Sequence, residues 1–159
     1  MPCCRPVRHE ILIDAPPERV FEVLCDLDRY SEWNRFTPRI TLASRDLAVG
    51  AELDLDCQMT EHELLEGERE VILAVERDPA RRRYALCMGT SRRRGRPGIR
   101  SERWQIASAL GERTLFENRE AFSGPLAPLV YWLYGKKLAR AFRLYGLDLK
   151  DRVETLAAT

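Results

Sequence analysis

The chain has 159 residues, 45% of them hydrophobic and 32% charged, and its 26 basic and 25 acidic residues leave a net charge of +1. This composition excludes a disordered, collagen-like or coiled-coil protein, and the length predicts one domain over residues 1–159, with 1–5 as a loose tail. Residues 1–10 lack the apolar run of a signal peptide, and the longest apolar-rich stretch, 126–134, is too short to span a bilayer, so we expect a cytoplasmic protein.

The first elements are a strand and two short helices. Residues 7–14 alternate apolar and polar side chains, which is typical of a half-buried strand. Pro16 and Pro17 then stand where the first turn of a helix tolerates proline, and apolar residues follow at helical spacing up to Leu27. A second short helix through Tyr30 is expected to end near Trp33, because Pro38 blocks its continuation.

From residue 38 to residue 124 the pattern is almost entirely that of strands. Odd positions of 51–57 are apolar and even positions are acidic, which predicts antiparallel strands with one wet face. Similar runs recur at 71–75, 84–88 and 104–106, and residues 78–80 and 110–112 are typical of tight hairpin turns.

Charge is segregated along this region. Residues 46–78 hold eleven acids and two bases, whereas residues 81–100 hold eight arginines and no acid. The arginines at 92–96 fit three hypotheses: a solvated turn, a phosphate grip, or a guide for an anionic ligand toward a pocket mouth. No nucleic-acid-binding motif accompanies them, so we do not expect nucleic acid as a partner.

The last strand, over residues 114–122, places polar side chains on an apolar face. Asn118 and Glu120 share the face that carries Phe116 and Phe122. Since a buried carboxylate without a partner is costly, this face either lines a cavity, which we favour, or points to solvent. An ion pair from Glu120 to Arg103 or Arg119 is the structural alternative to a functional role.

A long helix is predicted over residues 126–156, with one apolar stripe along its length. Its first turns are apolar nearly all round, through Leu126, Leu129, Val130, Trp132 and Leu133. We expect these side chains to be covered within the molecule. A second subunit, giving a homodimer, or a membrane surface contacting residues 126–134 are the alternatives.

This order of elements predicts an α+β fold. A strongly curved antiparallel sheet of about seven strands would wrap around the long C-terminal helix and leave a cavity between them, with the two short helices placed after the first strand. The side chains predicted to line that cavity are Leu53, Leu55, Met59, Val71, Leu73, Tyr84, Leu86, Met88, Trp104, Ile106, Asn118, Glu120, Phe122, Leu138 and Phe142.

Four strings carry a resemblance to a known family. IDAPPERVFEVLCD at 13–26, followed by YSEWN at 30–34, resembles the opening of the SRPBCC or START-like superfamily, which shares the helix-grip fold. RWQI at 103–106 and NREAFSGPL at 118–126 resemble its polyketide cyclase/dehydrase and lipid-transport branch. The resemblance covers nearly the whole chain and implies a hydrophobic cavity for lipids, polyketides or other apolar molecules. Arg35, Phe36 and Thr37 depart from the family's usual Trp-Asn-Pro.

The sequence offers little catalytic chemistry. His9 is expected to be a wall residue and His62 to face water, and no nucleophile elbow, phosphate-binding loop or dinucleotide fingerprint is present. The five cysteines form no C-x-x-C pair, so we predict no zinc site, no other metal and no cofactor, with Cys25, Cys57 and Cys87 as buried thiols.

Two functions of different classes remain, and we favour the first. The protein would bind a hydrophobic small molecule as a carrier or sensor, or it would be a cyclase/aromatase-type enzyme using Glu102 or Glu120 with a raised pKa. In the enzyme, Asn118 or Tyr84 would be the hydrogen-bond partner. An unpaired carboxyl deep in the cavity would favour the enzyme. A weaker third hypothesis is an interaction module that binds an anionic partner through the arginines at 92–100.

Overall fold

The computed structural model describes residues 5–159, so the predicted tail, with Cys3 and Cys4, lies almost entirely outside the described part. The elements in chain order are β1 (Val7–Ile13), α1 (Pro17–Cys25), the 3-10 turn η1 (Leu27–Arg29), α2 (Tyr30–Trp33), β2 (Arg39–Leu42), β3 (Glu52–Thr60), β4 (Glu63–Asp78), β5 (Arg83–Thr90), β6 (Arg100–Leu110), β7 (Arg113–Ser123) and α3 (Ala127–Ala157). The predicted α+β fold is confirmed.

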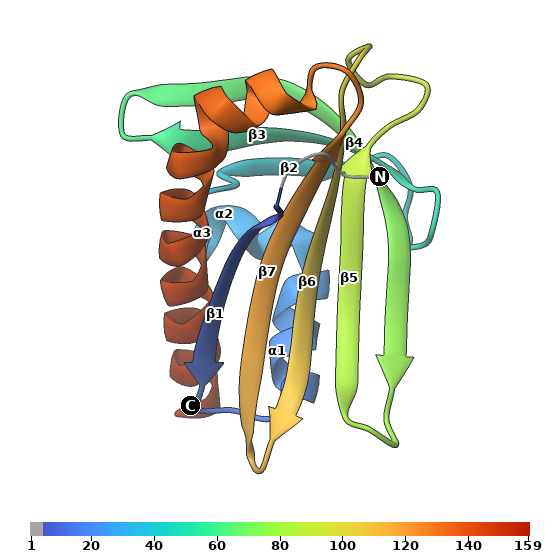
Figure 1. Cartoon of the computed structure of the whole chain (residues 1–159). Coiled ribbons are helices and arrows are strands. Elements are labelled where there is room, and N and C mark those ends of the chain that lie inside the picture. The colour runs from blue at the N-terminus through green and yellow to red at the C-terminus, as the bar shows by residue number, and fades with distance from the viewer. Residues whose placement is uncertain (1–4) are drawn as a thin grey trace.

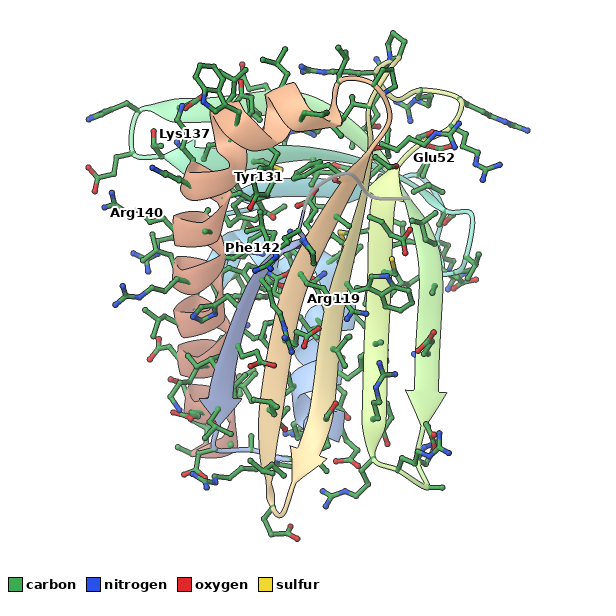
Figure 2. The ribbon with its side chains drawn as sticks, viewed as in Figure 1. Glu52, Arg119, Tyr131, Lys137, Arg140 and Phe142 are labelled. Carbon is green, nitrogen blue, oxygen red and sulfur yellow. The ribbon has the colours of Figure 1, made fainter. Side chains whose placement is uncertain are left out.

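The seven strands form one antiparallel sheet in the order β1-β7-β6-β5-β4-β3-β2. Figure 1 shows the sheet curving around α3, with α1 and α2 beside its concave face. Along α3 the predicted stripe is buried, through Leu138, Phe142, Tyr145, Leu149 and Val153. Figure 2 shows Phe142 on the side of α3 that faces the sheet and Arg140 on the solvent side. This is the helix-grip arrangement.

The turn between β6 and β7 decides which side chains face α3. Leu110 pairs with Arg113, and the same register continues to Arg103 opposite Glu120. Because paired residues share a face and faces alternate along a strand, Arg103 lies on the concave face with Glu120. Trp104 takes the opposite face, where its Nε1 donates a hydrogen bond to Glu102 Oε1 at 2.8 Å.

The expectation that Trp104, Ile106 and Glu102 face the interior is therefore wrong. All three lie on the convex side of β6, because they alternate along the strand with Arg103 and Gln105, which face the concave side. The apolar character of Trp104 and Ile106 suggested a core-facing pair, but the convex side of this sheet also buries some apolar side chains, Ile106 among them.

A bulge in β4 overturns two further expectations. Val71 pairs with Gly89 and Ile72 with Met88, but Ala74 pairs with Cys87, so one extra residue separates the two halves of the strand. Ile72 is fully buried on the concave face, whereas Leu73 is 40% exposed on the convex face. Val71 shares the convex face with Leu73, because alternation from Ile72 places both neighbours there.

The start of α3 is the third correction. Leu126, Leu129, Trp132 and Leu133 are all exposed, and Trp132 retains 78% of its accessible surface. Intramolecular cover was expected there and is absent for these four side chains. Within residues 5–159, no helix combines the length and the apolar character that crossing a membrane requires.

Candidate functional site

A cavity of about 170 Å³ lies between the concave face of the sheet and the first half of α3. Its walls are contributed by β3, β4, β6, β7, the loop before β6, α3 and the segment after α2. The lining residues are Phe36, Cys57, Met59, Leu65, Glu68, Glu70, Arg96, Ile99, Ser101, Arg103, Glu120, Phe122, Val130, Tyr134 and Leu138.

Arg103 is the central polar group of this cavity. Only 4% of the residue is exposed, and its guanidinium carbon lies 4.7–4.8 Å from the ring centroids of Phe36, Phe142 and Tyr145. Its Nε donates a hydrogen bond to Asn118 Oδ1 at 3.0 Å. The other side of the group, Nη2, is buried without a hydrogen-bond partner among the described residues. The cation is thus held by aromatic faces and one amide, with a donor left over.

Two carboxyl groups share the cavity with Arg103. Burial raises the pKa of Glu70 to about 8, helped by repulsion from Glu120 and opposed by the charge of Arg103. Burial also raises the pKa of Glu120, against the attraction of Arg103 and the Ser101 hydroxyl. Oε2 of Glu70 is buried without a hydrogen-bond partner in the part of the chain that the structure describes. With a pKa of about 8, Glu70 can therefore hold and release a proton inside the cavity near neutral pH.

The arginine-rich loop between β5 and β6 forms the rim of the cavity. Arg96 Nη2 lies 2.7 Å from Glu68 Oε1, and both residues line the cavity. Arg94 is tied to Asp54 at 2.8 Å. Beyond this rim lies a second, open hollow of about 250 Å³, which also includes Glu68, Glu70, Arg96, Ile99 and Ser101 in its lining. The Arg96–Glu68 ion pair thus stands where the cavity meets the outside.

Comparison with known proteins agrees with this geometry. A family model described as polyketide cyclase / dehydrase and lipid transport matches residues 6–158. The chain belongs to this family. No curated protein matches the sequence significantly.

Several solved structures share the fold of this chain although their sequences are at most 20% identical to it. TTHA0849 from Thermus thermophilus is 20% identical, with a TM-score of 0.69 and coverage of 98% of this chain and 99% of that one. The Zhui aromatase/cyclase from Streptomyces is 17% identical, with a TM-score of 0.68 and coverage of 94% and 93%. A START superfamily protein from Mycobacterium smegmatis is 18% identical, with a TM-score of 0.64 and coverage of 95% and 98%. The family match confirms the resemblance to the polyketide cyclase/dehydrase and lipid-transport branch, and these structures share its START-like fold.

The structure divides the predicted lining residues of this family member into three groups. Four line the cavity: Met59, Glu120, Phe122 and Leu138. Seven face inward but belong to the packed interior around it: Leu53, Leu55, Tyr84, Leu86, Met88, Asn118 and Phe142. Four lie on the convex face: Val71, Leu73, Trp104 and Ile106. Of the two candidate catalytic carboxyls, Glu120 is in the cavity and Glu102 is outside it.

Sequence reasoning named Arg103 only as a candidate ion-pair partner of Glu120, and it did not name Glu70 as a site residue. The sequence did contain a signal for Arg103: a two-residue turn at Gly111 and Glu112 fixes the register, so an inward Glu120 requires an inward Arg103. Glu70 had no comparable signal, since β4 contains two irregularities and its period of two cannot be followed from one end to the other.

The remaining titratable candidates lie elsewhere. His9 packs against Gly146 of α3, and burial lowers its pKa. His62 is exposed in the turn between β3 and β4. Cys57 lines the cavity, where burial raises the thiol pKa and keeps the sulfur neutral. Among residues 5–159 no three metal-ligating side chains gather at one place.

Proposed function

We propose that the protein is a cytoplasmic carrier or sensor that binds a small apolar molecule bearing an oxygen acceptor. The observation that carries this proposal is the cavity itself, in which aromatic and aliphatic walls surround the unpartnered Nη2 of Arg103. Apolar walls would supply affinity and the guanidinium would orient the ligand. The free thiols of Cys25, Cys57 and Cys87 suit a reducing compartment.

Cavity size limits the part of the ligand that can be enclosed. An apolar cavity of about 150 Å³ in a protein interior holds one benzene ring. The present cavity, at about 170 Å³, therefore fits one ring or a short branched chain. A longer ligand would extend past Arg96 and Glu68 into the outer hollow of about 250 Å³. We therefore propose a ligand with one enclosed ring and a tail or second ring at the rim.

The test is to block the cavity without disturbing the surface. Protein purified from its own cells is analysed by native mass spectrometry for a co-purified molecule, and its capacity is measured by titration with the dye 8-anilinonaphthalene-1-sulfonate. Val130→Phe adds volume at the cavity wall and is expected to reduce dye binding at least tenfold. Leu147→Phe, on the exposed side of the same helix, is the matched control and should bind like the wild type.

Equal dye binding by wild-type protein and Val130→Phe, with both folded by circular dichroism, would contradict the proposal. A second blocking variant, Leu138→Phe, guards against a misleading result from one substitution. Loss of binding in Leu147→Phe as well would show that the dye occupies the surface, which also counts against the cavity.

General acid–base catalysis is the second candidate, and the geometry of Glu70 favours it. A carboxyl with a free oxygen, a pKa of about 8 and a neighbouring carboxyl has the protonation behaviour that a cyclase or dehydratase needs. One of the solved neighbours is named as an aromatase/cyclase. The substrate would be a poly-β-keto compound whose enolisation and dehydration move protons through Glu70 and Glu120.

This candidate is tested by separating binding from turnover. Glu70→Gln keeps the size of the side chain and removes its proton exchange, so it should retain dye binding while losing conversion of a poly-β-keto thioester by at least about 100-fold. Glu61→Gln, on the exposed hairpin, is the control. No conversion by the wild type would rule out this activity on that substrate class and leave the binding proposal standing.

A further inference from the structure

An exposed apolar patch occupies the first turns of α3. It consists of Leu126, Leu129, Trp132 and Leu133, which are between 45% and 78% exposed. Scattered single apolar residues are ordinary on protein surfaces, but four adjoining ones that include a largely exposed tryptophan are unusual. This set is called the apolar patch below.

The apolar patch stands beside the mouth of the cavity. Val130 and Tyr134 come from the same turns of α3 as the patch, but their side chains line the cavity. One side of this short helical stretch thus faces the cavity, and the other side faces solvent. The apolar patch and the wall of the cavity therefore share the first turns of α3.

Positive charge lies next to the apolar patch. The backbone N–H of Leu126 donates a hydrogen bond to Gly98 O at 3.0 Å, which joins the start of α3 to the arginine-rich loop. Figure 1 shows this loop, between β5 and β6, and the start of α3 at the same end of the molecule. Within residues 91–100 and 126–137, four exposed basic side chains make no ion pair with any residue among 5–159. They are called the basic rim: Arg92, Arg93, Arg100 and Lys136.

Neither segment contains a negative charge. No Asp or Glu occurs in residues 79–101 or in residues 121–147. Two glutamates of β4 that approach these segments are already paired, Glu63 with Lys137 and Glu68 with Arg96. Glu61 and Glu66 of the adjoining hairpin make no ion pair in the described part of the chain, but neither belongs to the two segments. An anionic surface would therefore approach the basic rim.

We propose that the apolar patch and the basic rim dock this protein on an anionic lipid bilayer, with the mouth of the cavity toward the lipid. Trp132 would sit at the level of the headgroups, where tryptophan is favoured, while the leucines enter the boundary of the acyl chains. The basic rim would contact anionic headgroups. This goes beyond the proposed function and does not require a ligand in the cavity.

A second copy of the chain fits this surface less well. In a two-fold dimer each patch would meet its own copy, and the unpaired cations of the two basic rims would approach one another. Like charges that meet across an interface are unfavourable, whereas an anionic bilayer would neutralise them. The charge distribution therefore favours lipid.

The experiment is vesicle flotation with the purified full-length chain. Vesicles of phosphatidylcholine alone are compared with vesicles that also contain phosphatidylserine, at low and at high salt. The expected result is binding to the mixed vesicles only, with release at high salt, because the headgroup attraction is screened. Equal distribution on both kinds of vesicle, or no binding to either, would overturn the proposal.

Two variants separate the contributions of patch and rim. Arg92→Ser with Arg93→Ser is expected to lower partitioning about 25-fold, since each basic residue near an anionic surface contributes about a fivefold effect. Trp132→Ala should lower it at least fivefold. The controls lie at the opposite end of the molecule, where Arg81→Ser with Arg113→Ser and Leu110→Ala should partition like the wild type.

The outcomes distinguish this proposal from its alternatives. If the control variants lose binding as much as the patch and rim variants, the effect is one of net charge or hydrophobicity and the docking surface is wrong. If the wild type sediments as a dimer that Trp132→Ala dissociates, and does not float with vesicles, the patch is a subunit interface and the proposal fails. Cavity binding of the dye is measured in parallel and should be unchanged by Trp132→Ala.

Discussion

Arg103, which lines the cavity, donates a hydrogen bond of 3.0 Å from its Nε on β6 to Oδ1 of Asn118 on β7. The bond fixes one edge of the guanidinium while three aromatic rings cover its faces. Asn118 thereby occupies the position of an ion-pair partner without contributing a charge. The arrangement leaves the charge of Arg103 available to the two carboxyls and to a ligand, which an aspartate at 118 would not do.

Replacing this buried cation should destabilise the protein. Arg103→Met keeps much of the packing volume but removes the donor to Asn118, the contacts with the rings and the attraction that opposes protonation of Glu120. We expect the free energy of unfolding to fall by about 2 kcal/mol, because removing a buried, hydrogen-bonded charge costs more stability than removing an exposed one. The measurement is urea denaturation followed by circular dichroism.

Arg119→Met is the matched control, because this arginine lies on the convex face and pairs with Glu117 at 3.3 Å with its side chain 43% exposed. It should change stability by less than about 0.5 kcal/mol. Similar losses in the two variants would contradict the special role of Arg103.

Stability should also depend on pH through Glu70. Its folded pKa, about 8, is raised by burial, so the folded state holds this proton more tightly than the unfolded chain. The corresponding stability is complete below the unfolded pKa and is lost as the pH rises toward 8. Glu70→Gln removes this loss, and we expect the variant to be more stable than the wild type by about 1–3 kcal/mol at pH 8.5 and close to it near pH 5.

Urea denaturation at three pH values between these limits checks the prediction. Glu61→Gln, a change at an exposed side chain, should stay within about 0.5 kcal/mol of the wild type throughout. If the difference in unfolding free energy between Glu70→Gln and the wild type were the same at all pH values, burial would not raise the pKa of Glu70.

The fold could be predicted from the sequence because its signals are local and regular. The prolines at 16 and 17, the change from a period of two to helical spacing, and the long stripe of α3 each mark an element directly. The inward placement of Asn118 and Glu120 followed from the strict alternation of β7. These are places where one strand or helix alone decides which side is buried.

The site was less predictable because it depends on register between strands. The pairing of β6 with β7 reverses the face that the apolar residues of β6 suggest, so Trp104 was assigned inward in place of Arg103. In β4 the bulge after Ile72 shifts the alternation, so Leu73 was assigned inward in error. Phe36 reaches the cavity from the three residues that interrupt the family's usual motif, and no periodicity describes such a segment.

These two faces of the sheet can be told apart by truncating one aromatic on each. Phe122 lines the cavity and is 8% exposed, so Phe122→Ala should cost about 3 kcal/mol of unfolding free energy and enlarge the cavity. Trp104 is only partly buried, so Trp104→Ala should cost about 1 kcal/mol and leave dye binding unchanged. The pair is compared by urea denaturation and dye titration, and a larger effect of Trp104→Ala on dye binding would contradict the assigned faces.

The junction between the arginine-rich loop and α3 depends on Gly124. Its φ is +100°, and a Cβ at this position would lie 2.7 Å from the backbone oxygen of Gly98, closer than a carbon can approach. Gly124→Ala should therefore cost about 2 kcal/mol and loosen the loop, because both the backbone conformation and the contact are strained. Gly50→Ala is the control, since its φ is +89° but nothing lies within 4 Å of the added carbon.

Trypsin reports on the loop separately from global stability, because it cleaves after arginine and the loop carries Arg92, Arg93 and Arg94. At native conditions Gly124→Ala should be cut there several times faster than the wild type, while Gly50→Ala should keep the wild-type rate despite its own loss of stability. Equal cleavage of the two variants would mean that the loop is held by its ion pairs to Asp54 and Glu68 alone, and not by its packing against the start of α3.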